Sequence, residues 1–94
     1  MTPPGYSLVY HPLVVKHDIP RLGAAVRARV RKAIEQKLVE RPELYGLPLR
    51  GTLAQLWKLR VGDYRVVYTI VRKEVRIVVI AHRRDVYDLA EGRL

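Results

Sequence analysis

Three consecutive runs of alternating apolar residues constrain the fold of this chain more than any other feature of its sequence. The runs are 56–61, 64–71 and 75–81, and only two or three residues separate one run from the next. Side chains of a strand alternate between the two faces of a sheet, and strands joined by such short turns run antiparallel. The C-terminal part of the chain is therefore predicted to form a three-stranded meander sheet.

The first connection predicts which residues face each other across this sheet. A slip of one residue would turn every side chain to the other face, so the apolar pattern selects the register. With residues 62–63 as a two-residue hairpin turn, one face is apolar throughout and pairs Val61 with Tyr64, Leu59 with Val66 and Trp57 with Tyr68. The reverse face then pairs Arg60 with Arg65 and places Lys58 opposite Val67. We expect Trp57, Tyr64 and Tyr68 to be core residues.

The second connection extends the apolar face and gathers cations on the reverse face. With residues 73–74 as the turn, Ile70 pairs with Ile77, Tyr68 with Val79 and Val66 with Ala81, and His82 lies beside Arg65. Like charges directly opposed destabilise a sheet, whereas a bound phosphate group neutralises them and accepts paired hydrogen bonds from Arg. The sequence therefore predicts a cationic pocket made of Lys58, Arg60, Arg65 and His82. A solvated sheet face that binds nothing is the alternative interpretation.

The N-terminal part of the chain is predicted to supply a strand and two helices. Residues 6–10 are rich in β-prone side chains, and Pro12 suits the first turn of a short helix. Asp18 before Ile19-Pro20 is expected to mark either the start of a second helix or a break in the first, because proline lacks an N–H group. Apolar residues at three- and four-residue steps predict a long amphipathic helix over 24–39.

These elements together predict an α+β fold, in which an N-terminal strand and two helices pack on a small antiparallel meander sheet. Residues 43–51 contain Gly46, Pro48 and Gly51 and are interpreted as a loop, and residues 85–89 are expected to begin a last helical turn. A chain of 94 residues cannot divide its core between two units, so residues 1–94 are predicted to be a single domain.

Composition excludes several classes of protein. The chain has no Cys, and its three His residues do not show the spacing of zinc ligands, so neither a metal nor a cofactor is expected. No long apolar run and no signal sequence are present, which favours a cytoplasmic protein without a membrane partner. The 18 Lys and Arg residues against 9 Asp and Glu give a net charge of +9. Such an excess, mostly Arg, indicates a polyanion or an acidic protein as partner, or only a solvated basic surface.

Several segments of the chain resemble the RelE/ParE toxin superfamily. They are Leu49-Arg50-Gly51, Trp57-Lys58-Leu59-Arg60, Gly62-Asp63-Tyr64-Arg65-Val66-Val67-Tyr68 and His82-Arg83-Arg84-Asp85-Val86-Tyr87. The order of helices followed by a three-stranded meander is also the same, and the resemblance spans nearly the whole chain. It implies the RelE-like fold and a toxin of a type II toxin–antitoxin system, specifically an mRNA interferase.

The ribonuclease branch of that superfamily, as the resemblance implies, cleaves messenger RNA in the ribosomal A site and so inhibits translation. A ribose 2′-hydroxyl attacks the adjacent phosphodiester without a metal ion, and a cyclic phosphate results. The positions that match the family's catalytic residues are Lys58, Arg60, Arg65, Arg83 or Arg84, and Tyr87. Lys58, Arg60, Arg65 and His82 are expected to bind the RNA.

The matched residues suit the tasks that this reaction sets. Arg65 is expected to stabilise the charge of the phosphorane, and Lys58 or Arg60 to assist the nucleophile. Arg83 or Arg84 is assigned to the leaving group, because the alignment there is open by one residue. Tyr87 is assigned to base stacking or proton relay, with packing of the C-terminal segment as the alternative.

The resemblance also implies partners and leaves other functions open. A small acidic antitoxin is expected to wrap the domain, so the toxin would exist as a monomer or in a toxin–antitoxin hetero-oligomer. The alternative function is that of a ParE-like toxin, which inhibits gyrase without enzymatic activity on the same fold. A third is an RNA-binding module that binds RNA without cleaving it.

Overall fold

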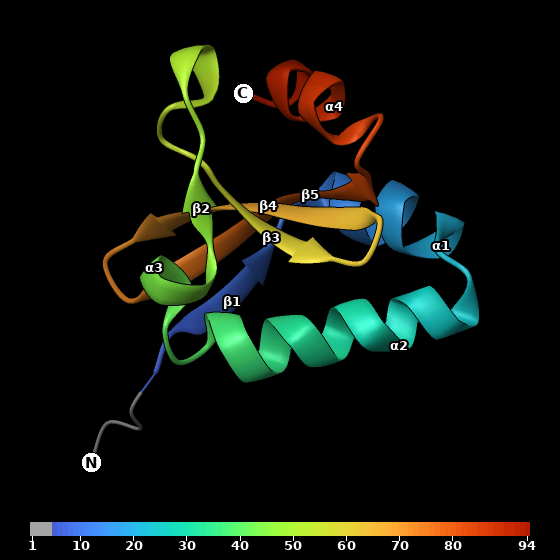
Figure 1. Cartoon of the computed structure of the whole chain (residues 1–94), viewed down its shortest axis with the longest axis horizontal. Coiled ribbons are helices and arrows are strands. Elements are labelled where there is room, and N and C mark those ends of the chain that lie inside the picture. Colours follow the sequence, from blue (N-terminus) through green and yellow to red (C-terminus); the bar gives the residue numbers. More distant parts are fainter. Residues whose placement is uncertain (1–4) are drawn as a thin grey trace.

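The strands of the protein form one five-stranded sheet in the order β1-β5-β4-β3-β2 (Figure 1). A computed structural model describes residues 5–94 of the chain. The strands are Ser7–Tyr10 (β1), Leu47–Pro48 (β2), Trp57–Val61 (β3), Tyr64–Val71 (β4) and Glu74–His82 (β5). β1 pairs with β5 in parallel, whereas β3, β4 and β5 form the antiparallel meander that the sequence predicts.

Helical segments cover both faces of this sheet, with α2 on one face and α4 on the other (Figure 1). In chain order they are η1 (Val14–Asp18), α1 (Ile19–Arg21), α2 (Ala24–Ala33), η2 (Ile34–Leu38), α3 (Pro42–Tyr45), η3 (Gly51–Leu53) and α4 (Val86–Gly92). The predicted α+β class is confirmed. Across residues 5–94, no helix combines the length and the apolar character that crossing a bilayer requires.

Each of the two N-terminal helices includes a π-helical segment, which is η1 in the first helix and η2 in the second. The helix predicted over 24–39 is present, but its last part, η2, is π-helical. A new helical segment, α1, does begin after Asp18 with Pro20 in its first turn, but the predicted break is wrong, because η1 runs directly into α1. α1 ends at Arg21, before Leu22 with a ψ of 138°. In η1 the Ile19 N–H donates to the Val14 carbonyl, five residues back, and this wider turn gives the ring of Pro20 room to follow.

The first hairpin has the predicted register in all five of its residue pairs, from Trp57 opposite Tyr68 to Val61 opposite Tyr64. Gly62 adopts a φ of 60°, a left-handed conformation that glycine reaches without steric cost. The residue type at the turn and the apolar face therefore specify the same pairing.

The second hairpin departs from the predicted register. The turn lies at residues 72–73 and not at 73–74, with Val71 opposite Glu74, and Arg72 takes a φ of 58° that its residue type does not favour. A bulge follows, because Val67 faces Val79 while Tyr68 faces Ile77, which leaves Val78 as the extra residue of β5. Tyr64 is consequently the residue opposite His82.

The loop predicted over 43–51 contains most of α3 and all of β2. Pro42 stands in the first turn of α3, where proline costs no hydrogen bond, and β2 is only two residues long. Its two residues pair with Lys58 and Trp57 of β3. Elements this short leave no periodic signal in a sequence that is rich in glycine and proline.

Two apolar clusters sandwich the sheet. The larger joins η1, α2 and η2 to the face of the sheet that carries Leu59, Val66 and Ile80. The smaller lies under η3 and α4 and contains Leu53, Leu56, Val67, Val79, Val86 and Ala90. We call these the α2 face and the α4 face of the sheet.

Tyr68 fixes the edge of the larger cluster through its hydroxyl. The side chain is fully buried, and its hydroxyl donates to the Pro42 carbonyl at 2.7 Å. Burial raises the pKa of Tyr68 far above its ordinary value of 10.0, and the nearby charge of Glu43 adds to the rise. A Cβ atom at Gly46 would collide with this hydroxyl, so the approach of α3 to β4 requires glycine there.

Candidate active site

Three cations lie together on the α4 face of the sheet. Arg60 is directly opposite Arg65, and Lys58 is opposite Val67, whose side chain belongs to the α4-face cluster. Because side chains alternate along a strand, Lys58, Arg60 and Arg65 share this face while Trp57, Leu59 and Tyr64 point to the α2 face. We call Lys58, Arg60 and Arg65 the cationic group.

Helix α4 brings Tyr87 to this group. The Lys58 Nζ atom donates to the Tyr87 hydroxyl at 3.3 Å and lies 5.8 Å from the centre of its ring. Both side chains are half-buried. Since the ammonium group is the donor, the hydroxyl proton of Tyr87 is free to point toward a substrate oxygen.

Arg65 is held in place by the backbone of the β3–β4 turn. Its Nη1 atom donates to the carbonyls of Gly62 and Tyr64, both at 2.9 Å. Neutral carbonyls orient the guanidinium but leave its positive charge intact. The arrangement therefore presents a fixed cation at the end of the sheet face.

The turn that connects β5 to α4 separates Arg83 from Arg84. The Arg83 N–H donates to the Asp63 carbonyl at 2.9 Å, which attaches this turn to the β3–β4 turn next to Arg65. The Arg84 side chain lies beside His82, with its Nε atom 3.5 Å from Nδ1 of His82. Both Arg side chains are exposed.

His82 does not join the cationic group, so its predicted place beside Arg65 is wrong. The corrected register sets His82 opposite Tyr64 on the α2 face, where the two rings meet edge to face with centroids 5.5 Å apart. Ala81 takes the position opposite Arg65. The Nδ1 atom of His82 accepts a hydrogen bond from the Arg84 N–H at 3.2 Å, so the neutral ring carries its proton on Nε2.

The cationic group carries charge that the fold does not neutralise. Among the described residues, no carboxylate lies within ion-pair distance of Lys58, Arg60, Arg65, Arg83 or Arg84. Directly opposed like charges such as Arg60 and Arg65 cost free energy unless an anion lies between them. This part of the α4 face is therefore suited to bind a polyanion.

The cationic group lies on an open surface. A cavity of about 480 Å³ is present in the molecule, but it lies between α1, the end of β5 and α4, and its lining includes Arg21, Tyr64 and His82 and none of the cationic group. Small-molecule sites are usually enclosed hollows, whereas a face with exposed cations suits an extended polymer. Among residues 5–94, no set of three potential ligands from His, Cys, Asp and Glu is placed to hold a metal ion.

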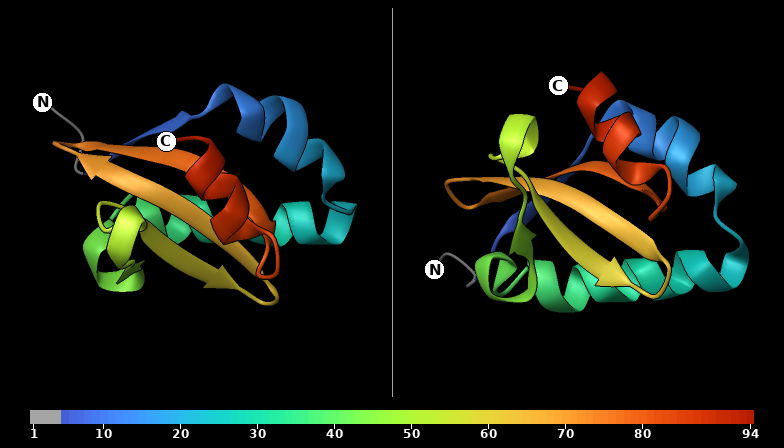
Figure 2. Two further views of the ribbon diagram at one scale, coloured as in Figure 1. Left: turned by 90° about the horizontal axis from the view of Figure 1, so that it is seen from above. Right: turned by 45° about the horizontal axis from the view of Figure 1, so that its top comes forward.

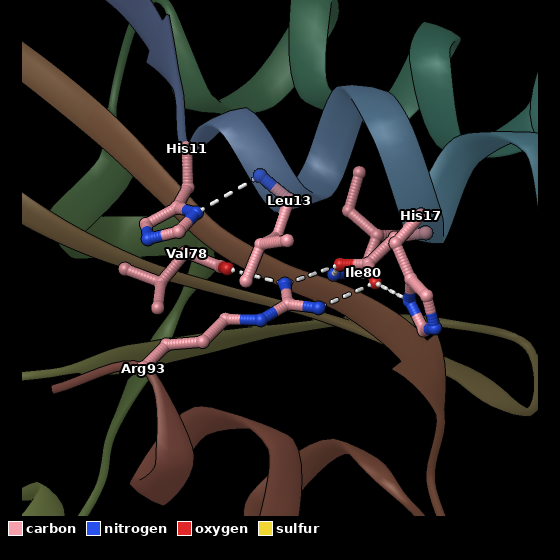
Figure 3. Close-up of polar contacts among 7 residues, drawn as sticks. His11, Leu13, His17, Val78, Ile80 and Arg93 are labelled. Atoms are coloured by element: carbon pink, nitrogen blue, oxygen red, sulfur yellow. Dashed lines mark hydrogen bonds and ion pairs between the residues drawn. The ribbon is translucent and has the colours of Figure 1, made fainter.

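A buried ion pair anchors the far end of α4, and nothing in the sequence predicted it. Two bonds, of 2.6 and 2.8 Å, join the guanidinium of Arg93 to the carboxylate of Asp18 (Figure 3). The side chains of Asp18 and Arg93 are 1% and 5% exposed. The partners are far apart in the chain and belong to no recognisable motif, so only the three-dimensional structure brings them together.

Asp18 is held in its charged form by its surroundings. Burial raises the pKa of this carboxyl, but the hydrogen bonds from Arg93, His17 and the Ile80 N–H, together with the charge of Arg93, outweigh it. The pKa of Asp18 therefore lies below its ordinary value of 3.8. We call the pair Asp18 and Arg93 the clasp.

Comparison with known proteins identifies the class of this molecule. Residues 6–87 match the family model described as the ParE toxin of the type II toxin–antitoxin system parDE. The chain is also 38% identical over 72 residues to Toxin RelE of Mycobacterium tuberculosis, an alignment that covers 74% of each protein.

Solved structures show the same fold. The toxin–antitoxin complex RelBE2 of Mycobacterium tuberculosis matches with a TM-score of 0.78 at 28% identity, over 84% of this chain and 99% of that one. A mutant of E. coli toxin RelE in the free state matches with a TM-score of 0.73 at 26% identity, over 96% and 98% of the two chains. An archaeal RelE–RelB complex from Pyrococcus horikoshii matches with a TM-score of 0.61 at 30% identity, over 84% and 96%.

The chain therefore belongs to the RelE/ParE superfamily, whose members are the toxins of type II toxin–antitoxin systems. Within that superfamily it is a toxin of the RelE family.

Proposed function

We propose that this toxin is a metal-independent endoribonuclease that cleaves messenger RNA in the A site of the ribosome and so stops translation. The observation that carries the proposal is the cationic group on the α4 face, which no carboxylate neutralises among the described residues and which has the Tyr87 hydroxyl beside it. A cut phosphodiester gains negative charge in its transition state, and fixed cations stabilise that charge.

The proposed reaction is an internal transfer at phosphorus. The ribose 2′-oxygen loses its proton and forms a bond to the adjacent phosphorus, while the bond from phosphorus to the 5′-oxygen breaks and that oxygen takes up a proton. The products are a 2′,3′-cyclic phosphate and a free 5′-hydroxyl. Atoms and charge balance without any further reactant.

Of the cationic group, only Lys58 can release a proton and serve as a base, because an Arg guanidinium remains protonated in proteins. We therefore assign activation of the 2′-hydroxyl to the neutral amine form of Lys58, toward which the neighbouring Tyr87 hydroxyl would turn its proton and so act as a relay. Arg65, which backbone carbonyls hold in place, stabilises the phosphorane, and Arg60 opposite it binds the same phosphate.

The role of contacting the leaving 5′-oxygen is assigned to Arg83 in preference to Arg84. The backbone of Arg83 is bonded to the β3–β4 turn that carries Arg65, whereas the Arg84 side chain contacts His82, which belongs to the α2 face. His82 has no role in the proposed chemistry.

The test adds purified protein to ribosomes programmed with a defined messenger and maps the 5′ ends of the fragments. The parent chain is expected to cut the message, and Arg65→Ala to cut it about 100-fold more slowly, since loss of one donor to a transition-state oxyanion costs on that order. Arg76→Ala is the matched control, because Arg76 pairs with Glu74 near the other end of β4 and β5. Intact message in the presence of the parent chain would refute the proposal.

One observation favours a second function, because the family model that matches residues 6–87 is that of a ParE toxin. Gyrase supercoiling is therefore assayed alongside cleavage. Inhibition of gyrase with intact message would establish the ParE-like activity, and salt-sensitive RNA binding without either effect would establish an RNA-binding module.

We further propose a cognate antitoxin as the partner of this chain in the cytoplasm. Two of the structural relatives are complexes of a RelE toxin with RelB or a related antitoxin. The net charge of +9 favours an acidic partner, and the toxin is then a monomer when free and part of a hetero-oligomer when inhibited.

A further inference from the structure

The clasp occupies the edge of the sheet where β1 ends. β1 pairs with β5 only as far as Tyr10 opposite Ile77, so among residues 5–94 no strand lies beside the following part of β5 on that side. There the Arg93 Nη1 atom donates to the Val78 carbonyl at 2.9 Å, and the Ile80 N–H donates to the Asp18 carboxylate at 2.9 Å. Val78 is the bulge residue, and the clasp bonds the backbone on either side of Val79 as a neighbouring strand would.

All the polar atoms of the clasp have partners. Asp18 accepts from Arg93, from the Ile80 N–H and from Nδ1 of His17, and within the described part of the chain no buried side-chain nitrogen or oxygen lacks a hydrogen bond. Removing two charges from water is costly, and a buried pair repays that cost only with such complete bonding. A fully bonded buried pair allows one relative placement of the segments it joins.

The segments joined by the clasp are the N-terminal helical segment and α4. Figure 2 shows η1 and α1 beside α4, and a shallow hollow between them is lined by His17, Leu89 and Arg93. α4 is only seven residues long, and its buried contacts are Val86 and Ala90. Tyr87 and Leu89 pack at the edge of the same cluster, and Thr52 bonds Glu91 at the surface, so Arg93 is the buried polar contact that holds the C-terminal end of this short helix.

Tyr87 lies between the two attachments of α4. At the N-terminal side the Arg83 N–H is bonded to the Asp63 carbonyl, and just after the C-terminal end Arg93 is bonded to Asp18. The contact between the Tyr87 hydroxyl and Lys58, at 3.3 Å, depends on where α4 lies. A displacement of about 1 Å in a reacting group can cost about 100-fold in rate.

We propose that Asp18 and Arg93 are positioning residues for the active site, which act on the reaction by fixing α4 and thereby the place of Tyr87 over Lys58. This inference rests on the proposed ribonuclease function. Neither residue touches the substrate, and both act through Tyr87.

The test is a double-mutant cycle that combines Arg93→Met with Tyr87→Phe. Arg93→Met alone is expected to lower kcat for message cleavage about 10-fold and to change KM less than about twofold, because the cationic group on the sheet is unaltered. In the Tyr87→Phe background, the same change is expected to lower kcat less than about twofold further, since the residue it positions is already impaired. Equal losses in both backgrounds would show that the clasp does not act through Tyr87.

A second measurement does not depend on cleavage. Amide hydrogen exchange in α4 is expected to become at least about 10-fold faster in Arg93→Met while the amides of β3 and β4 keep their parent rates. Arg93→Lys should recover part of both losses, since Lys keeps the charge but not the paired bonds. Arg76→Met is the matched control, because it breaks an exposed ion pair with Glu74 and should alter neither reading.

The outcomes separate the two proposals. Unchanged exchange in α4 overturns the clasp as a positioning device, whatever the activity. A parent chain that leaves the message intact refutes the ribonuclease, while faster exchange in α4 and loss of the Lys58–Tyr87 contact by NMR still support the role of the clasp in fixing α4. If Arg93→Met does not fold, Asp18→Asn takes its place, because it keeps the size of the side chain and the bond from Ile80. The same double-mutant cycle and the same exchange measurement then test the proposal.

Discussion

The two faces of the sheet are built from neighbouring residues of the same strands but do different things. The α2 face is apolar from Leu59 to Ile80 and is sealed by η1, α2 and η2. The α4 face is apolar only under η3 and α4, and beyond them it exposes cations. Alternation along a strand thus lets one face carry the larger apolar cluster while the other face combines a smaller cluster with exposed cations. Changes on the two faces should therefore separate stability from activity.

The largest loss of stability is expected from a substitution that creates a cavity in the apolar cluster of the α2 face. Ile34 of η2 is 1% exposed, and Ile34→Ala should lower the free energy of unfolding by about 3 kcal/mol through lost burial and the cavity left behind. Urea unfolding followed by circular dichroism measures this. Val15→Ala, at an exposed position, is the control and should cost less than about 0.5 kcal/mol. A similar loss in both variants would contradict the assignment of the core to this face.

Low pH should lower the stability of the protein through the clasp at the edge of the sheet. The pKa of Asp18 is lowered in the folded state, so its contribution to stability is complete above its ordinary pKa of 3.8 and is lost as the pH falls through the folded-state value. Unfolding by urea at a series of pH values should show this loss in the parent chain. Asp18→Asn should remove this part of the pH dependence, and equal acid sensitivity in both chains would contradict the depressed pKa.

Removal of the Tyr68 hydroxyl on the α2 face should have a smaller effect on the free energy of unfolding. Tyr68→Phe removes the bond to the Pro42 carbonyl and should lower the free energy of unfolding by about 1 to 2 kcal/mol, because the carbonyl loses its partner. The rate of message cleavage per folded molecule should stay at the parent value, since Tyr68 points away from the cationic group. A cleavage defect with unchanged stability would place Tyr68 in the site and would remove the distinction between the faces.

The smallest change in stability is expected on the α4 face. Arg60→Gln relieves the opposition to Arg65 and should change the free energy of unfolding by only a few tenths of a kcal/mol, toward greater stability. Cleavage of the message should fall about 10-fold, because a phosphate contact is lost. Thermal unfolding measures the change in stability, and the ribosome assay measures the change in cleavage. A loss of more than about 1 kcal/mol would mean that Arg60 supports the fold.

The sequence predicted the fold where residue type and apolar pattern agree. Gly62 supplies the left-handed turn that the first hairpin needs, and the apolar pairs then specify its register, which also places Lys58, Arg60 and Arg65 on one face. The second hairpin had no such signal, because Arg72 takes a left-handed φ without being glycine and the bulge at Val78 has no characteristic residue. The bulge, which shifts the pairing beyond it by one residue, moved His82 to the other face.

The clasp could not be predicted from the sequence, for a different reason. Asp18 and Arg93 are 75 positions apart, and their partners on β5 are backbone groups, which every residue possesses. Periodicity reports which face a residue occupies but not what lies beside the edge of a strand. It gives no sign of the contact between Lys58 and Tyr87 either, and only the family resemblance drew attention to Tyr87.

The parallel pairing of β1 with β5 has a consequence for how the molecule is made. β1 leaves the ribosome before its partner strand, which is synthesised more than sixty residues later, and Arg93 follows later still. Contacts so distant in the chain form late in folding. A growing polypeptide therefore lacks the pairing of β1 with β5 and an anchored α4 until residue 93 has emerged.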